Sequence, residues 1–435
     1  MHWTSNARRM ALGLVVLLAA VSLNRTARAQ PAPDVVPDHY IVVLRNDVPS
    51  ARQVADEHAR RHAAAVSHIY EDALKGYAAR IPQQALAALR RDPSVRFIAE
   101  DRVVEAVQST SQVVPTGITR IAADVSSQRA GDGAGSVSGP AVAVIDTGSG
   151  PHPDLNVVGG VNCSTGTSYN DGNGHGTHVA GTIGARDNGF GVVGMAPGVP
   201  LYAVRVLNNA GSGTWSSVIC GINWVTANAL TLGIRVANMS LGGSGSDDGN
   251  CGNTNNDALH LALCNSIART GVLYVVAAGN SAANLAGFVP AAYDEVLTVT
   301  AMADFNGQPG GGAAATCLAD VDDTAADFSN FTTAGSADAN HTIAAPGVCI
   351  LSTWKGGGYK TLSGTSMATP HVTGTAVLCI ATGACTGGPA TIMAKLRGDA
   401  AARPASYGFV GDPNHPITAG GQTRYYGYLT YAGGY

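Results

Sequence analysis

The chain has few charged residues and no excess of basic ones. Asp, Glu, Lys and Arg make up 13% of its 435 residues, and the formal net charge is −4. So little charge excludes a coiled coil or a disordered chain, and the lack of a basic surplus offers no footprint for nucleic acid. Hydrophobic residues at 45% and 55 glycines instead indicate a compact, loop-rich protein. The length fits one large domain and a smaller one.

The N-terminal apolar run is too short to span a membrane comfortably. It extends from Met10 to Leu23, whereas a spanning helix needs roughly 20 residues. Arg8-Arg9 precede it, and an Ala-x-Ala-like cleavage site follows at residues 27–29. We therefore expect a secretory signal peptide over residues 1–29 and a secreted protein without a membrane partner. Twin-arginine export is the alternative to the general secretory route.

Three short segments carry side chains suited to nucleophilic catalysis. Residues 141–146 read as a strand buried on both faces, and the strand ends in Asp146. His175 leads into a helix of small residues, which allows close packing against its partners. Ser366 follows a glycine turn and starts an alanine-rich helix, where unpaired N–H groups favour a nearby oxyanion. The chain order Asp, His, Ser is a known order for a catalytic triad.

Each of these residues, taken singly, also has a structural explanation. Asp146 could be a turn former or helix cap, and Ser366 could be an N-cap. Asn280 could be an ordinary turn residue after a glycine. Ser366 does not lie in a Gly-x-Ser-x-Gly elbow, because Ala368 holds the last position. That difference argues against an α/β-hydrolase esterase.

Five blocks in sequence order resemble the signature segments of the subtilisin-like serine proteases, with the proteinase K-like group as the nearest type. The resemblance covers about residues 107–400. It implies an α/β fold with a doubly wound, mainly parallel sheet and helices on both faces. It also implies a monomeric serine endopeptidase that acts on proteins and peptides. The five blocks are residues 146–148, 175–178, 238–243, 275–280 and 364–368.

The resemblance assigns a role to individual residues of these blocks. Ser366 would attack the scissile carbonyl, with His175 as the base and Asp146 orienting the imidazole. The Asn280 side chain and the Ser366 N–H would form the oxyanion hole. His178 is the alternative base, although the family uses the first histidine of the pair. A catalytically silent binding protein on the same fold and a more selective processing protease are the alternative functions.

The segments that would line the substrate pocket carry no charge. The resemblance therefore implies broad cleavage after apolar or aromatic residues. Phe288 corresponds to an aromatic residue at the pocket floor of proteinase K-like enzymes. Trp215 corresponds to a lid over a more distant subsite, and a core or surface tryptophan is the alternative. The expected substrate-binding residues are Ser240, Leu241, Gly242, Gly243, Ala277, Ala278, Gly279, Phe288 and Trp215.

Residues 152–155 and 185–194 resemble the two segments of the family's high-affinity calcium site. Calcium takes roughly six to eight oxygen ligands from carboxylates, amides and carbonyls. A simple turn at residues 187–189 is the alternative. A second acidic cluster at residues 320–327 is explained equally well by a solvated loop. The implied calcium ligands are the side chains of Asp154 and Asn188, the carbonyls of Arg186, Phe190 and Val192, and either Gln108 or Gln112.

All eight cysteines lie between Cys163 and Cys385. With a signal peptide and an even count they indicate disulfides, for which about a hundred connectivities are possible. A free reactive thiol is the alternative. Sequence proximity favours Cys251–Cys264 and Cys379–Cys385, which leaves Cys163–Cys220 and Cys317–Cys349.

Residues 30–106 resemble the inhibitory propeptide of the same family, which would make the chain's own propeptide a partner. We expect a small ferredoxin-like α+β domain with the order β-α-β-β-α-β. Removal of the propeptide is expected between Val104 and Val114. The expected strands are 39–44, 73–81 and one from 95, and the expected helices are 50–67 and 83–91.

Histidines are dense in the first helix of this region. His58 and His62 stand four residues apart, and His68 follows. We expect them on a solvated face, because the zinc motif His-Glu-x-x-His is absent. A metal site and pH-sensitive release of the propeptide are the alternatives.

The catalytic domain is expected over residues 107–404, followed by an extension at 405–435. The extension is rich in Gly and Tyr and shows no reliable helical or strand spacing. It could pack onto the catalytic domain, be trimmed or bind a polymer.

Overall fold

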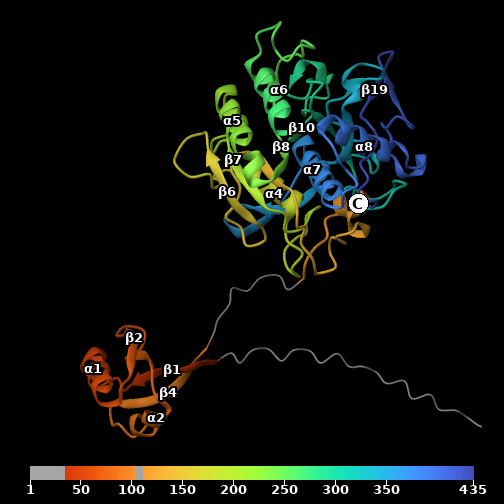
Figure 1. Ribbon diagram of the computed structural model, residues 1–435. Coiled ribbons are helices and arrows are strands. Elements are labelled where there is room, and N and C mark those ends of the chain that lie inside the picture. Colours follow the sequence, from red (N-terminus) through yellow and green to blue (C-terminus); the bar gives the residue numbers. More distant parts are fainter. Residues whose placement is uncertain (1–34, 103–110) are drawn as a thin grey trace, which may run out of the picture. The chain divides into compact units, whose positions relative to one another are not determined.

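The computed structural model describes residues 35–102 and 111–435, which belong to two separate units (Figure 1). The chain divides between Val107 and Gln108. The expected signal peptide lies outside the described residues, as does most of the expected processing segment. In the described ranges no helix is long and apolar enough to cross a membrane.

The N-terminal unit is a four-stranded antiparallel sheet in the order β2-β3-β1-β4. The two helices follow β1 and β3 in the chain, so the β-α-β-β-α-β prediction is confirmed. Val42, Leu44, Tyr77 and Leu89 pack in its core. Its elements are β1 (Val35–Leu44), α1 (Ala51–His62), β2 (Ala65–Tyr70), β3 (Gly76–Arg80), α2 (Gln83–Leu89) and β4 (Val95–Arg102).

Two expectations for this unit were wrong. The first helix does not continue to residue 67, because Ala63 takes a left-handed conformation with φ 54° and ends it. Ala65–Tyr70 form β2 instead. The histidines do not share a solvated face either, because His58 is buried. Its Nδ1 lies 2.6 Å from the Tyr77 hydroxyl, and its Nε2 lies 3.3 Å from Asp92.

The C-terminal unit is built on a sheet whose main path is β13-β12-β10-β8-β5-β7-β6, with β15 also paired to β12. All pairs are parallel except β12 with the short β13. The predicted mainly parallel sheet is confirmed. The strands are β5 (Ala141–Asp146), β6 (Val157–Asn162), β7 (Leu201–Arg205), β8 (Ile234–Met239), β10 (Leu273–Ala277), β12 (Leu297–Ala303), β13 (Thr324–Ala325) and β15 (Thr342–Pro346).

Helices cover both faces of this sheet because successive strand residues point to opposite sides. Val142 and Val144 pack with α4 (His175–Gly184), α7 (Thr365–Ala381) and α8 (Pro389–Ala401) on one side. Ala143 and Ile145 pack with α5 (Trp215–Leu232) and α6 (Ala258–Thr270) on the other. The chain around the sheet also forms α3 (Thr116–Arg120), β9 (Gly243–Ser244), β11 (Phe288–Val289), β14 (Thr332–Thr333), β16 (Ile350–Trp354) and β17 (Gly358–Leu362).

Four disulfide bonds cross-link this unit. The predicted pairing is confirmed at every cysteine, and no cysteine in the described residues is free. The bonds are Cys163–Cys220, Cys251–Cys264, Cys317–Cys349 and Cys379–Cys385.

The C-terminal segment is part of the same unit. It contains β18 (Ile417–Ala419) and β19 (Gln422–Tyr425), which form a three-stranded sheet with β14. Tyr426, Leu429 and Ala432 join the large core. The sequence showed no reliable strand spacing here because both strands are short and partly exposed.

Arg120 at the end of α3 is fully buried and ties the C-terminal segment to the acidic cluster. Its Nε donates to Asp323 Oδ1 at 2.8 Å, and its Nη2 donates to the carbonyls of Tyr407 and Gly408, each at 2.8 Å. The acidic cluster is therefore not a simple solvated loop. Asp320, Asp322 and Asp323 are buried and accept backbone N–H groups, while Asp327 is exposed.

Replacing Arg120 should destabilise this unit strongly. In Arg120→Leu the Asp323 carboxylate would remain buried without its cation, a loss typically worth about 3–5 kcal/mol. We expect a clear fall in the thermal midpoint, measured by differential scanning calorimetry. Arg269→Leu, which changes an exposed arginine, is the control. Equal midpoints for the two variants would contradict the importance of the buried pair.

Candidate active site

Asp146 lies at the carboxyl end of β5, in the middle of the parallel sheet. Its side chain is fully buried. Oδ1 accepts the Thr147 N–H at 2.7 Å, and the two carboxylate oxygens lie 2.8 and 3.0 Å from His175 Nδ1. A carboxylate accepts only, so Nδ1 carries the proton and Nε2 is free to act as a base.

The start of α4 holds His175 against this carboxylate. A Cβ at Gly176 would lie 2.0 Å from the Gly148 carbonyl oxygen, so only glycine permits this approach. The sequence analysis predicted a helix of small residues after His175 that packs closely against its partners, and α4 is such a helix.

Asp171, which sequence reasoning missed, connects the end of β5 to the start of α4 through hydrogen bonds. It accepts hydrogen bonds from the Thr147 and Thr177 hydroxyls and from the backbone N–H groups of Asn173, Gly174 and Thr177. The available signal was an Asp shortly before a predicted helix, which is typical of a capping residue.

The two histidines of α4 have opposite electrostatics. Burial alone would lower the pKa of His175, but the charge and hydrogen bond of Asp146, with help from Asp171, raise it above its ordinary value. Burial lowers the pKa of His178 to about 3. His178 Nε2 lies 3.0 and 2.9 Å from the carbonyls of Ile350 and Lys360. His178 therefore joins α4 to the hairpin of β16 and β17.

Ser366 lies in the first turn of α7, as the sequence predicted for a residue after a glycine turn. Its Oγ donates to the Ser240 carbonyl at 3.2 Å, and the Ser240 hydroxyl donates to the Ser366 carbonyl at 2.9 Å. In the described part of the chain no hydrogen bond joins Ser366 Oγ to His175. Hydrogen bonds between catalytic groups are often long without substrate and tighten in the substrate complex.

Asn280 follows β10 and lies beside the start of α7. Its Oδ1 accepts the Thr365 N–H at 2.8 Å and the Thr365 hydroxyl at 2.9 Å. These bonds fix the amide with its oxygen toward α7 and leave the Nδ2 donor for another group.

A cleft of about 810 Å³ opens beside His175. Five predicted substrate-binding residues line it: Trp215, Ser240, Leu241, Gly242 and Gly243. Other lining residues, which sequence reasoning missed, are Thr147, Asn173, Leu207, Ala210, Gly211, Ser212, Gly213, Thr214 and Val218.

The remaining predicted pocket residues are not among those that line this cleft. Ala277 and Ala278 are buried, and Phe288 packs against both Gly242 and Gly279. A Cβ on either glycine would come within about 3 Å of the Phe288 ring, at 2.4 Å for Gly242 and 3.0 Å for Gly279. Trp215 begins α5 and lies against Gly243 with 36% of its surface exposed. It is thus a cleft residue and not a core residue.

The two segments of the expected calcium site come together around Asp154. This carboxylate is buried and accepts Val192 N–H at 3.1 Å, Asn188 Nδ2 at 3.0 Å and the Tyr359 hydroxyl at 3.2 Å. Gln112 Nε2 lies 2.7 Å from the Arg186 carbonyl and 3.3 Å from the Val192 carbonyl. Gln108, the other candidate, lies outside the described residues.

A buried Asp–His pair beside a cleft, with a serine in the first turn of a neighbouring helix, defines the class of serine peptidases. The subtilase family model matches residues 137–423, and the peptidase inhibitor I9 model matches residues 39–106. The chain therefore belongs to the subtilase family and carries an inhibitor I9 domain before its protease domain.

Similar proteins agree with this assignment. The thermostable alkaline protease of Halalkalibacterium halodurans is 37% identical over 365 residues, which cover 84% of this chain and 87% of that protein. Subtilisin DY of Bacillus licheniformis is 43% identical over 277 residues, covering 62% and 85% of the two chains. A solved cold-adapted subtilisin-like serine proteinase superposes with a TM-score of 0.53 at 32% identity, covering 74% and 99%. The chain is thus a serine protease with a zymogen organisation.

Replacing Asp171 should alter both the rate and the pH dependence of peptide hydrolysis. Asp171→Asn keeps one acceptor oxygen and loses the negative charge, so the start of α4 should shift. A small misplacement of a catalytic group can cost on the order of 10²-fold in rate. Because the Asp171 charge helps to raise the pKa of His175, the acidic limb of kcat/KM should move to lower pH.

The measurement is the pH profile of kcat/KM with a chromogenic peptide. Asp412→Asn is the control, because Asp412 is also buried and its Oδ1 accepts two backbone N–H groups away from the cleft. An unshifted acidic limb in Asp171→Asn would remove the electrostatic role assigned to Asp171.

Proposed function

We propose that this chain is a secreted serine endopeptidase that cleaves after apolar or aromatic residues and matures by removing its own N-terminal domain. The observation that carries the proposal is the buried Asp146–His175 pair at the edge of an uncharged cleft. The hydrogen-bond link from Ser240 in the cleft wall to Ser366 supports one continuous site.

In the proposed mechanism Ser366 Oγ attacks the carbonyl carbon of the scissile bond while His175 Nε2 takes the hydroxyl proton. Asp146 holds the Nδ1 proton and stabilises the imidazolium that forms. His175 then gives its proton to the leaving amine as the C–N bond breaks. Water repeats the sequence on the acyl-enzyme and releases Ser366.

Asn280 Nδ2 and the Ser366 N–H would donate to the oxyanion formed during this attack. The two bonds that Asn280 Oδ1 accepts from Thr365 support this role, because they orient the amide before substrate arrives. Pre-oriented donors need no reorganisation as charge develops.

The substrate preference rests on the chemistry of the cleft. Leu207, Trp215, Val218 and Leu241 give it apolar walls, and its lining residues include no Asp, Glu, Lys or Arg. Such a surface favours apolar side chains over charged ones. A dedicated processing protease for basic sequences would need acidic residues in this lining.

We assign the domains as signal peptide 1–29, propeptide 30–106, catalytic domain 107–404 and C-terminal extension 405–435. The division of the chain near Val107 supports the second boundary. The extension packs into the catalytic core, which favours a role in stability over a separate binding role.

The residues around Asp154 fit a calcium ion. Burial raises the pKa of Asp154, and a cation would keep this carboxylate ionised. Gln112 faces two of the candidate carbonyls, so turning its amide would add another oxygen to the set. Asp154, Asn188, Gln112 and the carbonyls of Arg186, Phe190 and Val192 would hold the ion.

The first test compares secreted wild-type protein with Ser366→Ala. The wild type should lose its N-terminal unit and digest denatured casein, whereas the variant should keep its full length and release no peptides. Electrophoresis follows the processing, and mass spectrometry of the casein fragments gives the residue before each cut. If both proteins mature alike and neither digests casein, the alternative function of a catalytically silent binding protein is favoured.

Removing calcium should destabilise the enzyme. A ligand that binds only the folded state contributes about 2.7 kcal/mol at a hundred times its Kd, so EDTA should lower the thermal midpoint of Ser366→Ala. Calcium should restore the midpoint, and Asp154→Asn should abolish that response. Asp327→Asn, which changes an exposed aspartate, is the control. An unchanged calcium response in Asp154→Asn would refute this site.

A further inference from the structure

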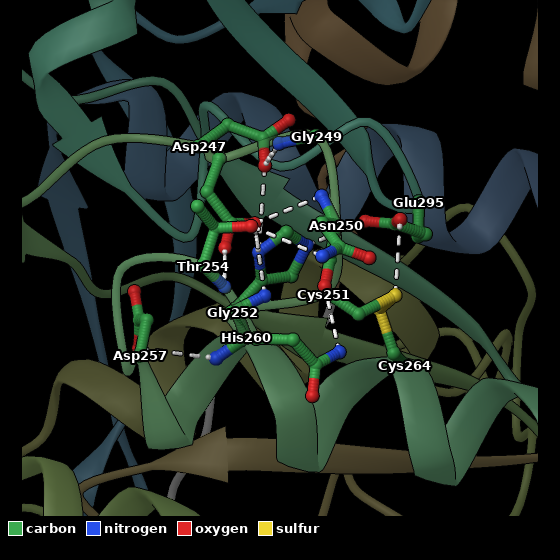
Figure 2. The surroundings of a disulfide bond; sticks show 12 residues. Asp247, Gly249, Asn250, Cys251, Gly252, Thr254, Asp257, His260, Cys264 and Glu295 are labelled. Atoms are coloured by element: carbon green, nitrogen blue, oxygen red, sulfur yellow. Dashed lines mark hydrogen bonds and ion pairs between the residues drawn. A yellow bond between two sulfur atoms is a disulfide. The ribbon is translucent and has the colours of Figure 1, made fainter.

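A buried histidine meets three carboxylates next to the Cys251–Cys264 disulfide (Figure 2). His260 lies in the first turn of α6 and is 0% exposed. Its ring stacks on Tyr293 at a centroid distance of 4.0 Å. Asp247 and Asp248 come from the loop before α6, and Glu295 lies on the other side of the ring. The protease mechanism uses none of these residues.

The tautomer of His260 follows from its contact with Glu295. His260 Nε2 lies 2.8 Å from Glu295 Oε2, and a carboxylate can only accept a hydrogen bond. Nε2 therefore carries a proton. Nδ1 is buried without a hydrogen-bond partner and faces Asp247 Oδ1 at 3.4 Å and Asp248 Oδ1 at 3.5 Å. A neutral ring turns its Nδ1 lone pair toward two carboxylates, an arrangement that a cation between them would stabilise.

That cation is either a proton on Nδ1 or a metal ion, and the distances distinguish the two. A charge-assisted N–H···O bond is about 2.7–2.9 Å long, and both contacts are longer than that. Ligand atoms bound to zinc at about 2.0–2.1 Å lie about 3.3–3.4 Å apart in a tetrahedron. The observed 3.4 and 3.5 Å match this separation.

We propose that His260 Nδ1, Asp247 and Asp248 bind a divalent transition-metal ion, with zinc as the expected ion and water completing the shell. One nitrogen and two carboxylate oxygens suit zinc, whereas calcium prefers oxygen ligands alone. Glu295 serves as the carboxylate that orients a metal-bound histidine through its other ring nitrogen.

The loop holds this ligand set in place before any ion binds. Asp248 Oδ1 accepts the N–H groups of Asn250 and Gly252, and Oδ2 accepts those of Thr254 and Asn255. A carboxylate has about four lone-pair sites, so Oδ1 would exchange one of its two N–H bonds for the ion. Asp247 Oδ1 accepts the Gly249 N–H at 2.9 Å, and its side chain is 17% exposed, so the site opens to solvent there. The disulfide joins Cys251 in the loop to Cys264, one turn after His260. Its sulfurs are bonded to each other and do not serve as ligands.

The ion would tie the loop that follows the cleft segment to α6. Ser240–Gly243 line the cleft, and Asp247 lies only a few residues further on. Metal binding itself does not depend on the proposed protease mechanism. It can therefore be tested in the inactive Ser366→Ala protein.

The test titrates full-length Ser366→Ala with Zn²⁺ by calorimetry and with Co²⁺ by absorption spectroscopy. We expect one more bound equivalent than in Ser366→Ala/His260→Gln, and a tetrahedral Co²⁺ spectrum that this variant lacks. Ser366→Ala/Asp247→Asn should bind at least tenfold more weakly. Because Asp247 is partly exposed, that variant keeps the test valid if His260→Gln does not fold. Excess Ca²⁺ should not compete.

Ser366→Ala/His415→Gln is the matched control, because His415 also pairs with an aspartate, Asp412, but is 43% exposed in its side chain. It should keep the zinc equivalent. Ellman's reagent should find no free thiol in the zinc-bound protein. Equal binding in the His260 and His415 variants, no binding of either ion, or binding only after reduction of the disulfide would each overturn the proposal.

Discussion

The contact between a buried aspartate and a histidine at the end of β5 determines much of the surrounding structure. A buried carboxylate is costly unless its oxygens are satisfied, and Asp146 satisfies them with Thr147 N–H and His175 Nδ1. That contact requires α4 to approach the strand end closely, which Gly176 permits. Asp171 then satisfies the N–H groups exposed at the start of the helix. The residues around β5 and α4 thus stabilise one buried hydrogen-bonded pair before any substrate is present.

Sequence reasoning was most successful where the signal is local. The strand ending in Asp146 and the helices beginning at His175 and Thr365 follow from apolar runs and glycine turns within a few residues. Two of the cysteine pairs were found because their members are close in sequence, and the remaining four cysteines were paired in chain order. The five cleft residues from Trp215 to Gly243 came from the family resemblance and not from periodicity.

The wrong expectations and the features that sequence reasoning missed concern residues whose environment is supplied by distant parts of the chain. Asp323 looked solvated because its partner Arg120 lies 203 residues earlier. His58 looked exposed on its helix, but Tyr77 and Asp92 cover it from β3 and from the turn before β4. The sequence did not indicate a site at His260, because Asp247 and Glu295 contact it from two separate loops. Neighbours in sequence could not reveal any of these contacts.

These distant contacts share one physical consequence. The parallel sheet pairs strands far apart in sequence, which makes its folding slow and its loops long. Arg120, the Cys163–Cys220 and Cys317–Cys349 bonds and the contacts of Asp154 each join parts of the chain that lie far apart in sequence. Where such contacts form after the folding transition state, they mainly slow unfolding. A protease that meets its own unfolded copies gains most from slow unfolding, because local opening is what exposes a chain to cleavage.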